Sequence, residues 1–237
     1  MIQLDSSAGR VDCYVARPPR GAGGATTSRG TSGAGGAATA TAANASGVLL
    51  LHAWWGLTDH FKRVCARLAA EGFVALAPDL HRGQTAETPE RAKELVGSVP
   101  DDERMAIVGA AVNHLKTVTG GKVGLLAFSM GAAYGTWLSA ERPDAVQALV
   151  LFYGGEDWMV DKLRAPVQWH FAETDEFVST ENVRALERQA HERGWEVYVY
   201  PGTEHAFFNT SRPEAYKPEA AALAWERLLG FYRRYLA

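Results

Sequence analysis

The sequence has little cysteine, no long apolar run and almost no excess of charge. Only Cys13 and Cys65 occur among 237 residues, and neither lies at a spacing typical of metal ligands or redox pairs. We expect both thiols to be small buried side chains, and we expect no metal or other cofactor. So few cysteines suit a protein of the reducing cytoplasm.

No apolar stretch reaches the roughly 18 residues that cross a membrane. The first residues lack the basic and apolar regions of a signal peptide. The formal net charge is −3, and the sequence contains no basic stripe. We therefore expect no membrane span and no nucleic-acid partner.

The composition is that of a globular protein, with 47% hydrophobic and 22% charged residues. We expect one domain over residues 1–237, as a monomer or a small homo-oligomer. One segment differs, because residues 21–46 are almost entirely Gly, Ala, Thr and Ser. Such a segment buries too little apolar surface to offset its ordering entropy, which predicts a flexible insertion between two strands.

Strand and helix patterns alternate along the rest of the chain. Apolar runs predict strands at residues 11–16, 48–52, 73–77, 123–128, 146–153, 167–171 and 196–200. Helical spacing predicts helices at residues 58–71, 89–96, 101–118, 129–140, 180–193 and 213–235. This alternation predicts an α/β fold with a mainly parallel central sheet and helices on both faces. Catalytic residues of such folds gather on loops at the carboxyl ends of the strands.

The loop that follows the strand at residues 123–128 is typical of a nucleophile elbow. It reads Ala127-Phe128-Ser129-Met130-Gly131, so that a buried strand ends at the serine and small residues open a helix. The helix N-terminus behind Ser129 favours developing negative charge. Ala127 stands where the motif has its first glycine, and the motif alone is also compatible with a serine that merely caps the helix.

A serine needs a base, and the base needs an acid to orient it. His205 follows the last predicted strand and is the candidate base, whereas His52 and His81 end other strands and are interpreted as pocket residues. Asp175 follows the strand at residues 167–171 and is the candidate acid. The order serine, acid, histidine on successive strands is typical of α/β hydrolases.

Two other carboxylates, Glu173 and Glu176, share the loop of Asp175 and are alternatives for the acid. An acyl-transfer site also needs donors for the oxyanion. The backbone N–H of Met130 is one candidate, and the backbone N–H of Trp54, in the loop after residues 48–52, is the other.

Together these segments resemble the dienelactone hydrolase family, from about residue 48 to the end of the chain. The matching pieces are the segments 52–56, 73–80, 174–178 and 205–207 and the elbow at Ser129. The resemblance implies a single-domain α/β hydrolase without a large lid that hydrolyses lactones and small esters without a cofactor. It implies a triad of Ser129, Asp175 and His205, with Met130 and Trp54 forming the oxyanion hole.

Two positions depart from the family's founding enzymes, which use a cysteine nucleophile and a nearby glutamate. Here Ser129 and Ala53 stand at those positions, a consistent pair of changes that indicates a general serine esterase. The family binds the carboxylate of dienelactone with arginines. Arg82 is one candidate, but Asn209 occupies the second position, with Arg212 nearby but off register.

We thus expect a carboxylic ester hydrolase whose partner is a small-molecule ester or lactone. The expected pocket residues are Trp55, His52, Arg82 and Phe128. A thioesterase or other acyl hydrolase on the same fold, or a catalytically silent small-molecule binding protein, are the alternatives.

Overall fold

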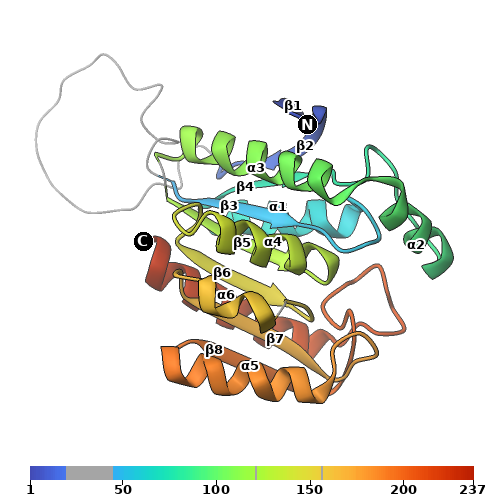
Figure 1. The fold of residues 1–237 in the computed structure, drawn as a ribbon, viewed down its shortest axis with the longest axis vertical. Coiled ribbons are helices and arrows are strands. Elements are labelled where there is room, and N and C mark those ends of the chain that lie inside the picture. Colours follow the sequence, from blue (N-terminus) through green and yellow to red (C-terminus); the bar gives the residue numbers. More distant parts are fainter. Residues whose placement is uncertain (20–44, 121, 156) are drawn as a thin grey trace, which may run out of the picture.

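The computed structural model describes residues 1–19, 45–120, 122–155 and 157–237, and its strands form one sheet (Figure 1). The strands are β1 Ile2–Ser6, β2 Gly9–Ala16, β3 Gly47–Leu51, β4 Val74–Pro78, β5 Val123–Phe128, β6 Ala148–Phe152, β7 Val167–Thr174 and β8 Glu196–Glu204. The helices are α1 Asp59–Ala70, α2 Pro89–Ser98, α3 Asp101–Val118, α4 Met130–Glu141, α5 Thr180–Arg193 and α6 Pro218–Leu236, with a 3₁₀ helix, η1, at Asp157–Lys162.

The sheet has eight strands in the order β1-β2-β4-β3-β5-β6-β7-β8. β2 pairs antiparallel with β1 and with β4, and all other pairs are parallel. Every residue of β3, β4, β5 and β6 is buried, as expected for parallel strands that helices cover on both faces. The mainly parallel α/β architecture predicted from the sequence is therefore confirmed.

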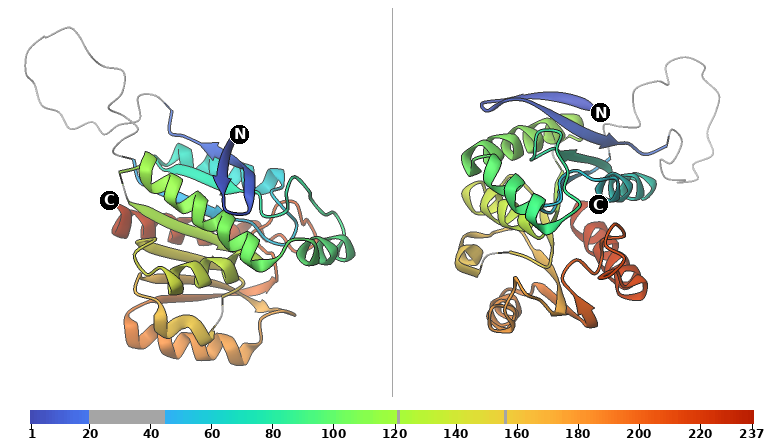
Figure 2. Two further views of the ribbon diagram at one scale, coloured as in Figure 1. Left: turned by 45° about the horizontal axis from the view of Figure 1, so that its top comes forward. Right: turned by 90° about the vertical axis from the view of Figure 1, so that its right-hand side faces the viewer.

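The helices lie in two layers. Figure 2 shows α1 and α6 on one face of the sheet and α3, α4 and α5 on the other. Alternate side chains of β3 feed these two layers: Val48 and Leu50 pack toward α1 and α6, whereas Leu49 and Leu51 pack toward α3 and α4. Because β3 is apolar on both faces, its sequence is a continuous apolar run and not an alternating one.

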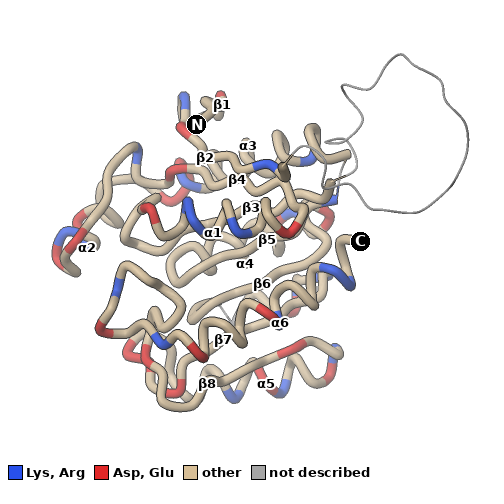
Figure 3. Tube along the Cα trace, turned by 180° about the vertical axis from the view of Figure 1, so that it is seen from behind, with Lys and Arg blue, Asp and Glu red and all other residues tan. Residues whose placement is uncertain are grey.

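Charged residues of both signs alternate on the outer surface. Figure 3 shows Lys and Arg interleaved with Asp and Glu along α1, α5 and α6. Among the residues described, no helix is long and apolar enough to cross a membrane.

Three features differ from the elements expected from the sequence. The strand β1 was not predicted, since only alternate residues of it are partly buried. The last helix begins at Pro218 and not near residue 213, because a turn held by Tyr216 N–H and the Arg212 carbonyl precedes it. The short helix η1 was also not predicted. Most of the expected insertion at residues 21–46 lies outside the described residues.

Candidate active site

The site begins at Ser129, between the end of β5 and the first residue of α4. Its backbone angles are φ 50° and ψ −118°, a conformation that a non-glycine residue adopts only at an energetic cost of about 1–3 kcal/mol. Two hydrogen bonds hold this turn, from Ser129 N–H to the Phe152 carbonyl at 2.9 Å and from Ala132 N–H to the Ser129 carbonyl at 2.8 Å. The surrounding structure therefore fixes the serine at the carboxyl edge of the sheet.

Small residues allow the strands and α4 to approach closely around this turn. A Cβ atom on Gly131 would lie 2.5 Å from the Leu51 carbonyl oxygen, and one on Gly154 would lie 2.9 Å from the Ser129 carbonyl oxygen. Both contacts are closer than carbon and oxygen tolerate, and both are with backbone atoms. These glycines are consequently required by the packing behind Ser129.

The structure brings Ser129, His205 and Asp175 into a hydrogen-bonded row. Ser129 Oγ lies 2.9 Å from His205 Nε2, and His205 Nδ1 lies 2.8 Å from Asp175 Oδ2. Asp175 directly follows β7 and His205 directly follows β8, so both loops reach the same sheet edge as the serine. The side chains are 13% and 4% exposed for His205 and Asp175.

The hydrogen bonds of this row fix the tautomer of the imidazole. Asp175 can only accept, so His205 Nδ1–H donates to it and the lone pair of Nε2 faces the Ser129 hydroxyl. The N–H groups of Phe177 and Val178 donate to Asp175 Oδ1 at 2.9 and 3.1 Å, which holds the carboxylate in place. The arrangement can therefore remove a proton from the serine hydroxyl.

The alternative acids lie elsewhere. Glu173 Oε2 accepts a hydrogen bond from the Gly202 N–H at 2.9 Å. Glu176 is exposed and lines a cavity next to His205. Asp175 is thus the one of the three loop carboxylates that His205 contacts.

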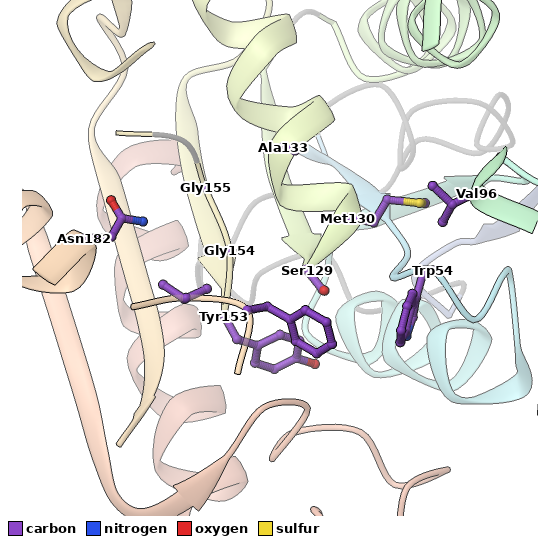
Figure 4. Close-up of a pocket in the computed structure, with 11 residues that line it drawn as sticks. Trp54, Val96, Ser129, Met130, Ala133, Tyr153, Gly154, Gly155 and Asn182 are labelled. Atoms are coloured by element: carbon purple, nitrogen blue, oxygen red, sulfur yellow. The ribbon is translucent and has the colours of Figure 1, made fainter. Parts of the chain in front are cut away.

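Two backbone N–H groups border the serine on its other side. Met130 opens α4, so that its N–H lies in the first helical turn, where no carbonyl one turn earlier can accept it. Trp54 lies in the loop after β3, and its side chain faces the space in front of Ser129 (Figure 4). Both groups are placed where a partial negative charge would be stabilised.

Buried histidines hold the loop that carries Trp54. The Ala53 carbonyl and the Trp54 N–H belong to one peptide group, and His52 Nδ1–H donates to that carbonyl at 2.7 Å. His81 Nε2–H donates to the Trp54 carbonyl at 3.0 Å. Burial lowers the pKa of both His52 and His81 to about 4, so both rings are neutral near pH 7.

A cavity of about 350 Å³ opens directly in front of Ser129 (Figure 4). Its lining residues are Trp54, Val96, Ser129, Met130, Ala133, Tyr153, Gly154, Gly155, Phe177, Val178 and Asn182. None of these side chains is charged. In Figure 4, Val96 and Trp54 lie on one side of Ser129, and Asn182 lies at the opposite end.

A second cavity, of about 850 Å³, lies against His205. Its lining residues are Trp54, Trp55, Pro89, Lys93, Val96, Thr174, Glu176, Phe177, Glu204, His205, Ala206, Arg212, Glu214 and Ala215. Trp54 and Phe177 line both cavities, and their rings meet edge to face with centroids 5.5 Å apart. We call the first the serine cavity and the second the histidine cavity.

Comparison with known proteins places this fold and site. The sequence profile of the dienelactone hydrolase family matches residues 34–236, which is most of the chain. The chain belongs to the dienelactone hydrolase family. It is therefore a hydrolase built on an α/β-hydrolase fold, and its family matches the resemblance seen in the sequence.

Individual members of the dienelactone hydrolase family share about a third of its residues. The protein named usf from Aquifex pyrophilus is 34% identical over 204 residues, covering 80% of this chain and 88% of the relative. A protein of Aquifex aeolicus, provisionally named a carboxymethylenebutenolidase, is 34% identical over 203 residues, with the same coverage of 80% and 88%.

Among solved structures, a provisionally named dienelactone hydrolase from Klebsiella pneumoniae has a TM-score of 0.76. Its sequence identity is 23%, and the match covers 98% of this chain and 97% of that one. This likeness shows the fold. As in the resemblance drawn from the sequence, no large lid covers the serine cavity within the described part of the chain.

Three residues expected in the pocket of this dienelactone hydrolase family member lie elsewhere. His52 is fully buried, and its Nε2 accepts the Leu80 N–H at 3.0 Å. Phe128 is fully buried in the core and stacks on Phe152. Arg82 pairs with Glu103 and donates to the Ala8 carbonyl at 2.8 Å, so it lines neither cavity.

The fourth expected pocket residue, Trp55, does line a cavity, namely the histidine cavity. Its ring carries the Arg212 guanidinium, whose central carbon lies 3.3 Å from the ring centroid. His81, also interpreted as a pocket residue, is fully buried and lines neither cavity. Buried position and short reach therefore separate the histidines of this loop from the cavities.

Sequence reasoning missed Tyr153 and Asn182, which line the serine cavity. The Tyr153 hydroxyl and Asn182 Oδ1 are buried without a hydrogen-bond partner in the described structure. Burial raises the pKa of Tyr153, so its hydroxyl remains an O–H donor. Tyr153 directly follows β6, and its place at a strand's carboxyl end is the signal that identifies it. No group of three metal-ligating side chains occurs among the residues described.

Proposed function

We propose that this protein hydrolyses small esters or lactones, with Ser129 as nucleophile, His205 as base and acid, and Asp175 as the group that orients His205. The observation that supports this most is the hydrogen-bonded row from Asp175 through His205 to Ser129, which ends at an apolar cavity. The names of relatives in the family, including a carboxymethylenebutenolidase, favour the same class of substrate.

In the proposed reaction, His205 Nε2 takes the hydroxyl proton as Ser129 Oγ attacks the carbonyl carbon of the substrate. The N–H groups of Met130 and Trp54 stabilise the resulting oxyanion. The tetrahedral intermediate collapses, the bond to the alcohol oxygen breaks, and that oxygen takes the proton from His205. An acyl group then remains on Ser129.

Water completes the cycle. His205 takes a proton from the water as its oxygen attacks the acyl carbon, and the second intermediate releases Ser129 Oγ, which regains a proton from His205. The product is a carboxylic acid. Asp175 keeps the imidazole in the required tautomer and stabilises its cationic form throughout.

The direct test is hydrolysis of p-nitrophenyl acetate and butanoate at neutral pH. We expect Ser129→Ala to lower kcat/KM by a factor of about 10³ or more, because the variant has no nucleophile to form an acyl-enzyme. Ser6→Ala, in the exposed strand β1, is the matched control and should keep the wild-type rate.

A fluorophosphonate reagent gives an independent readout of the same proposal. It should attach to the wild type and to Ser6→Ala but not to Ser129→Ala, as measured by intact mass. Equal hydrolysis by Ser129→Ala and wild type would assign the chemistry to another residue. A wild type that neither reacts with the reagent nor hydrolyses esters would show that Ser129 is not activated.

A further inference from the structure

The reacting pair sits at the junction of two unlike cavities. Ser129 lines only the serine cavity, and His205 lines only the histidine cavity. The Trp54 and Phe177 rings, in contact edge to face, border both cavities. A substrate that reaches Ser129 Oγ and His205 Nε2 at once must therefore extend into both cavities.

The chemistry of acyl transfer decides which part of the substrate enters which cavity. Three groups surround the attacked carbon: the oxyanion, the alcohol oxygen and the acyl chain. The oxyanion is directed to the Met130 and Trp54 N–H groups, and the alcohol oxygen must approach His205 to receive its proton. The acyl chain is left with the serine cavity.

We propose that the serine cavity is the acyl subsite and the histidine cavity the alcohol subsite, and that the acyl group is short, uncharged and largely apolar. This assignment rests on the proposed function. The walls of the acyl subsite are mostly apolar, with Val96, Ala133 and Val178 among them. At about 350 Å³ it is also much the smaller of the two cavities, compared with about 850 Å³.

The absence of charge from the acyl subsite excludes an acyl group that carries a second carboxylate. No cationic side chain is among its described lining residues, and a carboxylate there would lose its hydration without gaining a partner. Arg82 is paired with Glu103 on the far side of the loop. Arg212 is held on the Trp55 ring and bonds to the Glu87 carbonyl at 2.9 Å.

Two neutral polar groups take the place of a cation. The Tyr153 hydroxyl and Asn182 Oδ1 are buried, unpartnered and part of the lining. They suit an uncharged hydroxyl or carbonyl substituent on the acyl chain. The alcohol subsite differs, since Glu176, Glu204 and Glu214 outnumber Lys93 and Arg212 there. A larger, polar alcohol fits that side.

Matched alanine-to-leucine variants test the assignment. Ala133 lines only the acyl subsite, Ala215 lines only the alcohol subsite, and Ala70 is exposed at the end of α1 and serves as control. We expect Ala133→Leu to lower the kcat/KM of p-nitrophenyl hexanoate relative to acetate by about tenfold. Ala215→Leu should instead lower that of 1-naphthyl acetate relative to ethyl acetate. Ala70→Leu should shift neither ratio.

The charge of the acyl group is tested with two esters of equal length. We expect the wild type to hydrolyse p-nitrophenyl pentanoate at least about tenfold better than the p-nitrophenyl monoester of glutaric acid. Equal rates for the two would overturn the uncharged acyl group, and exchanged effects of Ala133→Leu and Ala215→Leu would overturn the orientation. A wild type that hydrolyses none of these esters would instead reject the proposed function, and this assignment with it.

Discussion

Unfavourable backbone conformations are concentrated around the reacting groups. Ser129, Tyr153 and Ala206 have positive φ angles of 50°, 37° and 67°, although none of them is glycine. Each comes directly or almost directly after a strand, at the ends of β5, β6 and β8. Such conformations persist only where the surrounding packing imposes them. The rest of the sheet therefore stabilises three strained residues that aim the serine, the cavity wall and the histidine loop.

His52 acts on the site at the scale of a single hydrogen bond. Its Nδ1–H holds the carbonyl of the peptide group whose other end is the Trp54 N–H. We expect His52→Ala to lower kcat by about tenfold or more with little change in KM, because the oxyanion donor loses its fixed orientation. Steady-state kinetics on p-nitrophenyl acetate would measure this.

The conservative variant separates this positioning role from a general loss of packing. In His52→Asn the side-chain amide N–H can take the place of Nδ1–H, so part of the lost kcat should return. Thermal unfolding should be followed in parallel for both variants. If kcat falls equally in both, while unfolding changes alike, the effect is one of packing and not of the Trp54 peptide.

At the scale of elements, the position of α4 depends on the lack of a side chain at its second residue. Gly131 faces the Leu51 and His52 carbonyl oxygens, and a Cβ there would lie 2.5 and 2.6 Å from them. The helix can approach β3 only because this Cβ is missing. The same approach sets the Met130 N–H in front of the cavity.

Two glycine-to-alanine variants with opposite outcomes test this packing. Gly131→Ala should lower the free energy of unfolding by a few kcal/mol, since two backbone segments would have to separate. Gly230→Ala, in α6 with no atom within 4 Å of the added Cβ, should raise it by about 0.5–1 kcal/mol through helix propensity. Urea unfolding measures both. A neutral Gly131→Ala would show that α4 is free to move away.

How far the sequence predicts these elements depends on the signal each one carries. The buried strands β3, β5 and β6 are continuous apolar runs, and their predicted positions are confirmed. β1 was missed because its register with β2 comes from tertiary pairing, with only a weak alternation of its own. The true start of α6 at Pro218 depends on a turn that bonds Lys217 N–H to the Phe207 carbonyl, a contact that no local pattern reveals.

The site shows the same division. Ser129, Asp175 and His205 could be found because each directly follows a strand, in a recognisable order. The direction of a side chain could not be found in this way. Phe128 immediately precedes the serine but packs into the core, and Arg82 follows a strand but turns toward Glu103. Tyr153 needed only its position after β6 to be proposed.

At the scale of the whole molecule, buried neutral histidines link stability to pH. Burial lowers the pKa of His52 and His81 to about 4 and that of His60 to about 3. Between pH 6.5 and these values, the unfolded chain binds protons that the folded chain excludes. The free energy of unfolding should therefore fall with decreasing pH, by about 1.4 kcal/mol per pH unit for each such histidine.

Urea unfolding at pH 7.5 and pH 5.0 would measure this dependence. His60→Asn removes one of the titrating groups and should make the dependence less steep. His191→Gln, at an exposed position in the last turn of α5, should leave it unchanged. Equal stability of the wild type at the two pH values would contradict neutral burial of these rings.

The order of the strands also makes hydrolysis a clock for refolding. Ser129 follows a central strand, whereas His205 follows β8, an edge strand whose only partner in the sheet is β7. Chain segments that lack β8 can collapse and bury tryptophan, yet they lack the base. Regained turnover would thus time the docking of this last strand, and the interval between tryptophan burial and first turnover would measure how long the chain exists as a compact but inactive species.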